Sequence, residues 1–376
     1  MDLVKREFVM DVMKVRLKPT VLLYKNNPNK VVLRFCSEII EFDDERGDIR
    51  FFFGLLCGTY TSKEILDEYA KKYPYDSGRA RDYLDALNEL KLIELQPQDY
   101  SPLSDTQKER YSRNFEFFNS ALPVGMNKYG IQCSLLDSRV VVLGCGGLGS
   151  HIILELAALG VGNLTIVDFD LIELSNLNRQ ILYREADLGR KKVFAARNNA
   201  LTFNSSINIT PVEKKIESVL DIKEIIVGHD LVICVADKPR NSMVKWLNEA
   251  CCKAKIPYIN GGLDIRKAVF YSVIPGETGC TECWKSFLPE QNRKIIDEDS
   301  RTQNDYMTPA PALSALVSVT TGAMICEAIK LLTDLQPPSL TNNLKTFSFD
   351  DLTITTTEKW RLNPECHCCE IIEGRK

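Results

Sequence analysis

The chain has 376 residues, 47 of them basic and 51 acidic, which gives a formal net charge of −4. This length suits about two to three domains, and the balanced charge offers no broad basic surface for nucleic acid. No apolar run approaches the length that spans a bilayer, and the first residues mix charges among apolar ones, unlike a secretion signal. We therefore expect a soluble, cytoplasmic protein with neither nucleic acid nor a membrane as its partner.

The chain contains 13 cysteines, an odd number in a long chain without a signal sequence. This usage argues against a disulfide framework. Most of the cysteines lie among apolar residues and are expected to pack inertly. Five gather in two short stretches near the end of the chain, which suggests a metal site: Cys280, Cys283, Cys366, Cys368 and Cys369.

The first 95 residues are predicted to form a small domain. Apolar runs at 21–24 and 31–35 flank the polar residues 25–30, which indicates a β-hairpin, and a buried run follows at 51–56. Thr61 and Glu64 have the spacing of a capping box, so a helix should begin there. A second helix would place Tyr83, Leu84, Leu87 and Leu90 on one face. Strands followed by helices suggest a compact α+β unit resembling a winged helix.

Residues 96–109 are polar, contain two prolines and are predicted to be a linker before a second domain at 110–376. In that domain apolar strands alternate with helical patterns from 139 to about 259, which indicates a Rossmann-like, doubly wound, mostly parallel sheet in an α/β domain. Beyond Gly261 the pattern predicts an antiparallel extension, with a strand at 268–274. An apolar helix is expected at about 312–332.

A glycine-rich turn follows the strand predicted at 139–143 and opens a helix. Gly144, Gly146, Gly147 and Gly149 would let the backbone approach a phosphate at the helix N-terminus. Asp168 ends the next predicted strand, where a carboxylate can accept hydrogen bonds from ribose hydroxyls. A glycine turn without a ligand is the alternative, but both halves of this pattern favour a nucleotide.

Polar residues after the second strand favour ATP over a dinucleotide. Asn176, Arg179 and Gln180 follow that strand, and Lys192 opens the next helix. An enzyme that releases pyrophosphate needs such groups, because the leaving group gathers charge, whereas a neutral nicotinamide does not. Taken alone, these residues could also be an ordinary solvated run.

Asp237 follows the predicted strand at 231–235. A carboxylate at the carboxyl end of a strand faces the ligand in doubly wound folds and could hold Mg²⁺ with phosphate oxygens and water. The alternative is that Asp237 caps the helix that begins near Pro239.

Together with the stretch 110–113, these motifs resemble the ThiF/MoeB/ubiquitin-activating family of adenylating enzymes over about residues 108–370. The resemblance implies that Asp168 holds ribose, that Asp237 organises Mg²⁺ and that Gln180 supports three phosphate-binding residues, Asn176, Arg179 and Lys192. It also implies that Arg113 reaches into the site of a partner subunit, and therefore a homodimer. The expected reaction is attack of a carboxylate on the α-phosphate of ATP, which needs no general base because the carboxylate is already ionised.

The cysteines near the end of the chain form two C-x-x-C pairs far apart in sequence. Four thiolates would make a closed, structural Zn²⁺ site and tie the C-terminal tail to the domain; these are Cys280, Cys283, Cys366 and Cys369. His367 or Cys368 could replace one ligand, and a redox C-x-x-C pair is the other alternative.

Relatives that form a thioester use a cysteine downstream of the first zinc pair. Residues 284–312 of this chain contain none, and Cys251 and Cys252 lie within a predicted helix. Activation without a thioester is therefore expected.

The first 95 residues also resemble PqqD-like domains, which bind leader peptides in ribosomal peptide biosynthesis. The matching stretches are 16–19, 55–61 and 90–94. In such domains an extended peptide adds a strand to a sheet edge. We expect that edge at 31–35, beside the helix with Tyr83 and Leu87; a dimerisation or purely structural role is the alternative.

This pairing of domains resembles the branch of the family that matures ribosomal peptide antibiotics. It predicts ATP-dependent adenylation of a carboxyl group on a precursor peptide. The nucleotide either stays on the peptide, as in microcin C maturation, or leaves during dehydration or cyclisation, as in pantocin maturation. Activation of a Gly-Gly carrier protein, and a non-enzymatic or NAD-binding module, are the competing hypotheses.

Overall fold

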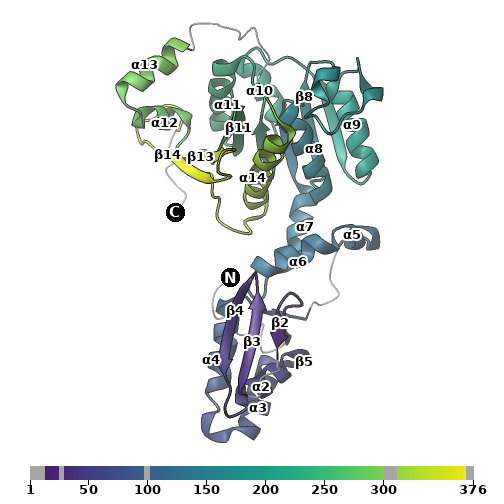
Figure 1. Cartoon of the computed structure of the whole chain (residues 1–376), viewed down its shortest axis with the longest axis vertical. Helices are drawn as coiled ribbons and strands as arrows, with labels where there is room; N and C mark the ends of the chain where they lie inside the picture. Colours follow the sequence, from purple (N-terminus) through teal and green to yellow (C-terminus); the bar gives the residue numbers. More distant parts are fainter. Residues whose placement is uncertain (1–12, 25–28, 97–101, 300–310, 370–376) are drawn as a thin grey trace. The chain divides into compact units, whose positions relative to one another are not determined.

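The computed structural model describes residues 13–24, 29–96, 102–299 and 311–369 (Figure 1). Its internal contacts divide the chain into a first unit, residues 1–133, and a second unit, residues 134–376. The N-terminal charge pattern, and parts of the predicted hairpin turn, the linker and the segment 284–312, lie outside the described residues.

The first unit contains two three-stranded antiparallel sheets with the strand orders β5-β1-β6 and β2-β3-β4. Side chains alternate between the two faces of each strand. On β3, Val31 and Leu33 point into the core and are fully buried, whereas the next residue, Arg34, is exposed. The strands are β1 (Lys14–Leu17), β2 (Leu22–Tyr24), β3 (Lys30–Phe35), β4 (Glu38–Asp43), β5 (Cys57–Thr61) and β6 (Ile93–Leu95).

Three helices cover this core: α2 (Asp48–Leu55), α3 (Ser62–Lys72) and α4 (Arg79–Glu89). The capping box predicted at Thr61 and Glu64 is confirmed, since each side chain bonds the other's backbone N–H. Leu84 and Leu87 are buried on α4 as expected. Leu90 is not, because the helix ends before it and 48% of its surface is exposed.

Two expectations for this unit are wrong. Strands and helices do not follow in separate blocks: residues 51–55 belong to α2, β5 precedes α3, and β6 follows α4. The segment 31–35 is also not an edge, because β3 pairs with β2 on one side and β4 on the other. Leu87 is buried in the core and the Tyr83 hydroxyl bonds Asp48, so both side chains serve packing in this unit.

Three further helices follow: α5 (Asp105–Arg110), α6 (Ser112–Ala121) and α7 (Lys128–Asp137), the last of which spans the boundary between the units. α5 lies within the stretch predicted as a linker. It begins with a capping box in which Ser104 and Gln107 exchange hydrogen bonds, a signal that a polar linker can hide.

The second unit is built on an eight-stranded sheet of order β14-β13-β12-β11-β10-β7-β8-β9. The predicted mostly parallel sheet is confirmed: β11, β10, β7, β8 and β9 run parallel, and the predicted antiparallel extension consists of β12, β13 and β14. The strands are β7 (Arg139–Leu143), β8 (Asn163–Asp168), β9 (Asn208–Glu213), β10 (Leu231–Cys234), β11 (Tyr258–Asp264), β12 (Lys267–Val273), β13 (Asn343–Ser348) and β14 (Ile354–Lys359).

Helices cover both faces of this sheet (Figure 1). Val141 and Leu143 share a core with residues of α10 and α11, whereas the alternate residues of β7 point the other way, toward the layer where α8 contacts α9 and α14. The helices are α8 (Gly147–Leu159), α9 (Lys192–Phe203), α10 (Val219–Ile226), α11 (Arg240–Ala254), α12 (Thr281–Phe287), α13 (Glu290–Asp299) and α14 (Ser314–Thr333).

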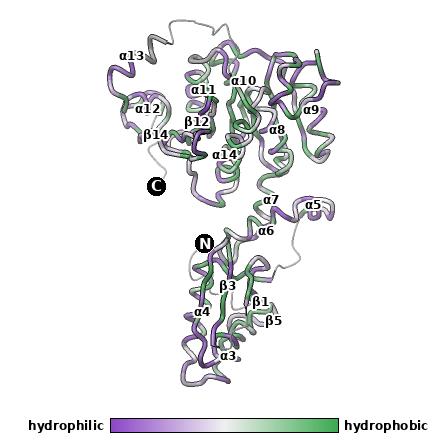
Figure 2. The backbone as a smooth tube through the Cα atoms, viewed as in Figure 1, coloured by the Kyte–Doolittle hydropathy of each residue, from purple (hydrophilic) through white to green (hydrophobic). Residues whose placement is uncertain are grey.

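One helix contradicts the expectation that no apolar run is long enough to span a bilayer. By length and composition α14 passes that test, and it is mostly hydrophobic, unlike α13 (Figure 2). Yet α14 packs on α8, β10, β11 and β12, and the buried Thr320 and Glu327 lie on its inner side. These contacts are those of a core helix, which also needs an apolar sequence.

Candidate nucleotide and metal sites

The glycine loop lies where the parallel sheet reverses its winding order. β7 and β10 are neighbours there, and their carboxyl ends point to the same edge. Gly144 has φ +98°, and a Cβ at this position would lie 2.9 Å from the Ala236 nitrogen. A Cβ at Gly149 would lie 1.9 Å from the Gly144 oxygen. Glycine is therefore required at both positions, and α8 begins in this loop with its N-terminus open to an anion.

Asp168 ends β8, next to the glycine loop, as the sequence predicts. One carboxylate oxygen accepts the Cys145 N–H at 2.7 Å and the other accepts the Asp170 N–H at 2.8 Å. Each oxygen keeps a further lone pair, so the half-buried carboxylate can still accept hydrogen bonds from hydroxyl groups.

The segment 176–180 lies against the glycine loop. A Cβ at Gly147 would lie 3.5 Å from the Arg179 side chain, and one at Gly146 would lie 3.9 Å from Gln180 Nε2. Arg179 Nη1 donates to the Ser175 carbonyl at 3.1 Å and to Asn178 Oδ1 at 2.9 Å, whereas Nε and Nη2 have no partner among the described residues.

Two amides complete this segment. Asn176 is 9% exposed, and its side-chain oxygen accepts the Glu173 N–H at 3.2 Å, closing a tight turn. Gln180 is 2% exposed, and among the described residues its Oε1 has no hydrogen-bond partner. A buried amide oxygen without a partner beside a glycine loop suits a group that binds a ligand or an ordered water.

Lys192 opens α9 and is brought into the same site by an acidic neighbour. Its Nζ lies 2.9 Å from Asp170 Oδ2, and only 6% of the residue is exposed. Asp170 thus links Lys192 to Asp168, two residues before it. We call the glycine loop, Asp168, residues 176–180 and Lys192 the nucleotide site.

Asp237 follows β10, and its neighbour Ala236 contacts Gly144 of the nucleotide site. The side chain is exposed. The helix-cap alternative is wrong, because Pro239 holds the N-cap position of α11 and no side chain caps that helix. An exposed carboxylate beside the glycine loop, with no partner among the described residues, fits the oxygen ligand that Mg²⁺ prefers.

Two buried side chains that the sequence did not single out form hydrogen bonds to main-chain carbonyls of this site. His151 on α8 is 3% exposed, and its Nε2 lies 3.0 Å from the Arg179 carbonyl. Burial lowers the pKa of His151. The Tyr183 hydroxyl donates to the Cys145 carbonyl at 2.7 Å, and burial raises the pKa of Tyr183 well above its ordinary value. In the sequence, His151 is one of three polar residues in a mostly apolar helix, beside Ser150 and Glu155, which does not single it out.

Arg113, which is predicted to reach into the site of a partner subunit, lies on α6 of the first unit with its side chain exposed. Its predicted role stays a prediction.

The second site is a cluster of thiols from both C-x-x-C pairs, which we call the thiol cluster: Cys280, Cys283, Cys366 and Cys369. Their sulfurs lie within 4.8 Å of one another, with Sγ–Sγ distances of 3.9, 3.7 and 3.6 Å. A tetrahedron with Zn–S bonds of about 2.3 Å needs sulfurs about 3.8 Å apart. The cluster therefore fits zinc, and Cys369, rather than Cys368 or the exposed His367, completes it.

Hydrogen-bond donors surround these thiols. Asn248 Nδ2 lies 3.6 Å from Cys280 Sγ, and the Asn363 N–H points at Cys283 Sγ over 3.3 Å. The Asn248 side chain is fixed by Tyr258, whose hydroxyl donates to Oδ1 at 2.7 Å. Such donors stabilise thiolate ligands. Cys251 and Cys252 on α11 are buried beside the cluster, as packing predicts.

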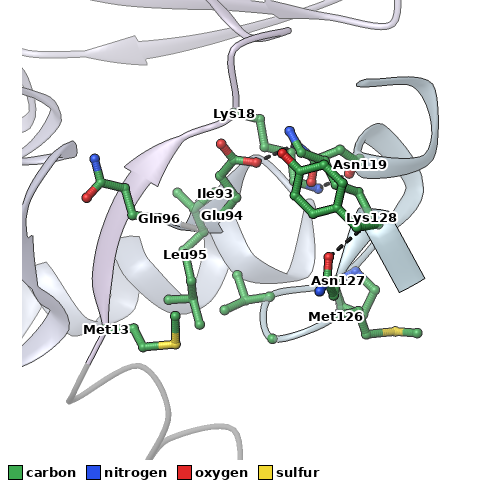
Figure 3. A pocket seen from close by; sticks show the side chains of 14 residues that line it. Met13, Lys18, Ile93, Glu94, Leu95, Gln96, Asn119, Met126, Asn127 and Lys128 are labelled. Atoms are coloured by element: carbon green, nitrogen blue, oxygen red, sulfur yellow. Dashed lines mark hydrogen bonds between the residues drawn. The ribbon is translucent and has the colours of Figure 1, made fainter. Parts of the chain in front are cut away.

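The first unit contains a cavity of about 240 Å³ between β6 and residues 123–129 (Figure 3). Lys18 Nζ donates to the carbonyls of Asn119 and Leu122 at 2.6 and 2.7 Å, and Glu94 accepts from Arg16 and Asn119. Burial lowers the pKa of Lys18 to about 8. Lys18 and Glu94 in the cavity wall are therefore already hydrogen-bonded within the protein. They form a closed polar network and do not indicate a ligand.

Comparison with known proteins identifies the family of the second unit. A model of the ThiF family matches residues 111–368. The molybdopterin-synthase adenylyltransferase of Escherichia coli K12 is 32% identical over 270 residues, which cover 71% of this chain and 98% of that protein. The SAMP-activating enzyme E1 of Haloferax volcanii is 31% identical over 272 residues, covering 71% of this chain and 90% of that protein.

Solved structures extend the likeness to the first unit. E. coli MccB, crystallised with ATP, superposes with a TM-score of 0.77 at 26% identity, covering 95% of this chain and 99% of that one. PaaA superposes with a TM-score of 0.62 at 24% identity, over 74% of this chain and 92% of that one, and shares the fold.

Proposed function

This chain belongs to the ThiF family and is an ATP-dependent adenylating enzyme, and we propose that its substrate is a carboxyl group on a ribosomally made precursor peptide. The observation that carries this proposal is how far each likeness reaches. The curated activating enzymes of E. coli and H. volcanii match 71% of this chain, whereas MccB matches 95%. MccB has also been crystallised with MccA bound. The additional similarity lies in the first unit, which favours an MccB-like substrate.

In the proposed reaction a carboxylate oxygen of the peptide attacks the α-phosphorus of ATP. An O–P bond forms, the bond from the α-phosphorus to the bridging oxygen breaks, and pyrophosphate leaves with the electron pair. No proton moves, because the carboxylate is ionised at neutral pH. The protein therefore has two tasks, which are to position the reactants and to neutralise the charge of the leaving group.

The residues of the nucleotide site suit these tasks. Asp168 would hold the ribose hydroxyls. Arg179 and Lys192 would balance the phosphates, and the amides of Asn176 and Gln180 would donate to phosphate oxygens. Arg179 has free guanidinium donors, and Gln180 has an unpartnered side-chain oxygen, a position its amide nitrogen could equally occupy.

Two metals fit the donors present. Asp237 would hold Mg²⁺, which would neutralise phosphate charge. Zinc in the thiol cluster would have a structural role, since all four positions of its tetrahedron are filled by thiols.

The first unit would hold the peptide, consistent with its resemblance to PqqD-like domains. Because β3 is central, we propose that the peptide adds at the outer edge of the six-residue strand β4, which pairs with no further strand among the described residues. Ile40 and Phe42 on β4 pack on the same core as α4, so this edge is firmly held for strand addition.

We further propose a homodimer in which Arg113 reaches the partner's site. The supporting observation is that Arg113 and Phe117, one helical turn apart on α6, are both exposed, with 64% of Phe117 accessible. Sedimentation at micromolar concentration tests the dimer. Mixing Arg113→Ala chains with Lys192→Ala chains tests whether Arg113 acts in the partner's site. Restored activity in the mixture would support it.

Pyrophosphate release tests the substrate assignment. The enzyme would be given Mg-ATP with synthetic peptides encoded by short reading frames beside its gene, and separately with a carrier protein ending in Gly-Gly. Release that requires a peptide supports the proposal. Rapid release with the carrier protein alone would overturn it.

Carrier activation remains the second candidate, because the curated relatives include a protein named sulfur carrier protein ThiS adenylyltransferase, from Bacillus subtilis, which is 30% identical over 226 residues. Mass spectrometry of a modified peptide would then divide the two outcomes of peptide activation. An added nucleotide mass means that the nucleotide is retained, and a lost water means dehydration or cyclisation.

A further inference from the structure

The loop that carries Arg179 has little regular structure of its own. Residues 169–191 connect β8 to α9, and their regular elements are the three-residue turns η2 (Leu174–Asn176) and η3 (Glu185–Asp187). A connection of this kind needs tertiary contacts to hold its side chains in one place. The guanidinium donors of Arg179, which are proposed to bind the phosphates, are therefore positioned only as precisely as this loop is held.

His151 supplies such a contact at Arg179. It projects from α8, the helix that starts in the glycine loop, and its Nε2 lies 3.0 Å from the main-chain carbonyl of Arg179. A carbonyl only accepts, so Nε2 must carry the proton. The other ring nitrogen faces the Ser318 hydroxyl on α14 at 3.4 Å, which orients the ring from its far side.

The burial of His151 makes this contact hard to replace. The residue is 3% exposed and sits among the apolar side chains of α8, where Ile152 and Ile153 are fully buried. Water therefore has little access to the Arg179 carbonyl on this side. Removing the imidazole would leave the carbonyl without its side-chain donor in a dry setting.

We propose that His151 is a positioning residue for nucleotide binding, which fixes the backbone at Arg179 so that its guanidinium group faces the phosphates. The role rests on the proposed function of Arg179. It concerns ATP, however, and is independent of which carboxylate the enzyme activates.

The test measures equilibrium binding of the non-hydrolysable analogue AMPCPP with magnesium to the full chain, so no peptide is needed. His151→Leu keeps a similar volume without the donor, and His151→Gln returns an N–H close to the position of Nε2. We expect His151→Leu to weaken binding about tenfold, as for one lost hydrogen bond, and His151→Gln to restore most of it.

A double-mutant cycle separates positioning from general stability. In an Arg179→Ala background, His151→Leu should cost less than about threefold, because the group that it positions is gone. An equal cost in both backgrounds, or unchanged binding in folded His151→Leu, would overturn the proposal.

The control is Asn204→Ala, which removes another buried side-chain donor to a main-chain carbonyl near the other end of α8, that of Ala157. It should leave AMPCPP binding unchanged. If His151→Leu does not fold, His151→Asn takes its place, since its amide is too short to reach Arg179; equal binding by the Asn and Gln variants would then refute the role. Failure of peptide adenylation would not affect any of these readouts.

Discussion

The thiol cluster and the nucleotide site are both assembled from distant parts of the second unit, yet they differ in how they treat solvent. The cysteines of the cluster are 0–8% exposed, and their sulfurs lie at mutual distances that a single ion satisfies. The nucleotide site keeps Asp168 and Arg179 half-buried, and Asp237 beside it is exposed. A closed site supports structure, whereas an open one leaves room for a substrate.

This difference has an energetic consequence. Removing a ligand from the closed site should cost stability, because the metal's binding energy is also folding energy. Removing a side chain from the open site should cost activity, while leaving stability nearly unchanged, since an exposed carboxylate makes few contacts.

The largest effect is expected from Cys369→Ser. The protein should purify with zinc in equimolar amount, and this variant should lose it. Its thermal midpoint should fall by about 10 °C or more, because 1 kcal/mol shifts the midpoint by about 2–4 °C in a domain of this size. Cys368→Ser is the control, since Cys368 lies outside the cluster. Zinc content measured by mass spectrometry and a thermal scan give the answer, and full zinc in Cys369→Ser would refute the ligand assignment.

The next effect is on activity alone. Asp237→Ala should lower magnesium-dependent pyrophosphate release by about 100-fold to 1000-fold, the usual cost of losing a charge-stabilising group at a reacting centre. Its unfolding midpoint should stay that of the wild type. Asp350→Ala, an exposed carboxylate on the turn between β13 and β14, should change neither quantity. If Asp237→Ala kept normal turnover, the metal assignment would be wrong.

Local signals in the sequence predicted much of both sites. The glycine loop between β7 and α8 was predicted because strand, glycines and helix are contiguous. The two C-x-x-C pairs were predicted because each pair is local, although only the structure shows that Cys369 rather than Cys368 completes the cluster. Neither inference needed to know how distant strands pair.

Non-local pairing explains what the sequence did not predict. The hairpin pattern at 31–35 is real, but it cannot reveal that β4 adds to its other side and makes β3 central. His151 escaped notice because its partner is a main-chain carbonyl 28 residues away, and any residue type supplies a carbonyl. Backbone acceptors leave no mark on a sequence.

A smaller effect is expected when a hydrogen-bond donor to a metal ligand is removed and the ligand itself is kept. Asn248→Ala should weaken zinc retention about 10-fold to 100-fold, because Nδ2 no longer donates to the Cys280 thiolate. Asn363→Ala is the matched control, since the donor to Cys283 is its main-chain N–H, which the substitution keeps. Competition with a chromogenic chelator measures both variants. Equal retention by the two would show that Asn248 does not support the metal.

The smallest effect tests a closed polar network without any metal, in the first unit. Lys18 is 2% exposed, and burial lowers its pKa to about 8, against 10.5 in the unfolded chain. Between these values the unfolded chain binds more protons than the folded one, so the contribution of Lys18 makes the free energy of unfolding rise with pH. Below pH 8 Lys18 is protonated in both the folded and the unfolded chain. Its contribution to the free energy of unfolding is then unfavourable and does not change with pH.

Lys18→Met should remove this dependence. Urea unfolding of both proteins from pH 7 to pH 10.5 gives the difference in free energy at each pH, which cancels the other groups that titrate in this range. The advantage of the wild type over Lys18→Met should grow as the pH rises above about 8. A constant difference would mean that the two carbonyls and Glu94 hold the lysine charged as strongly as water does, so that a closed network can bury a charge at no cost.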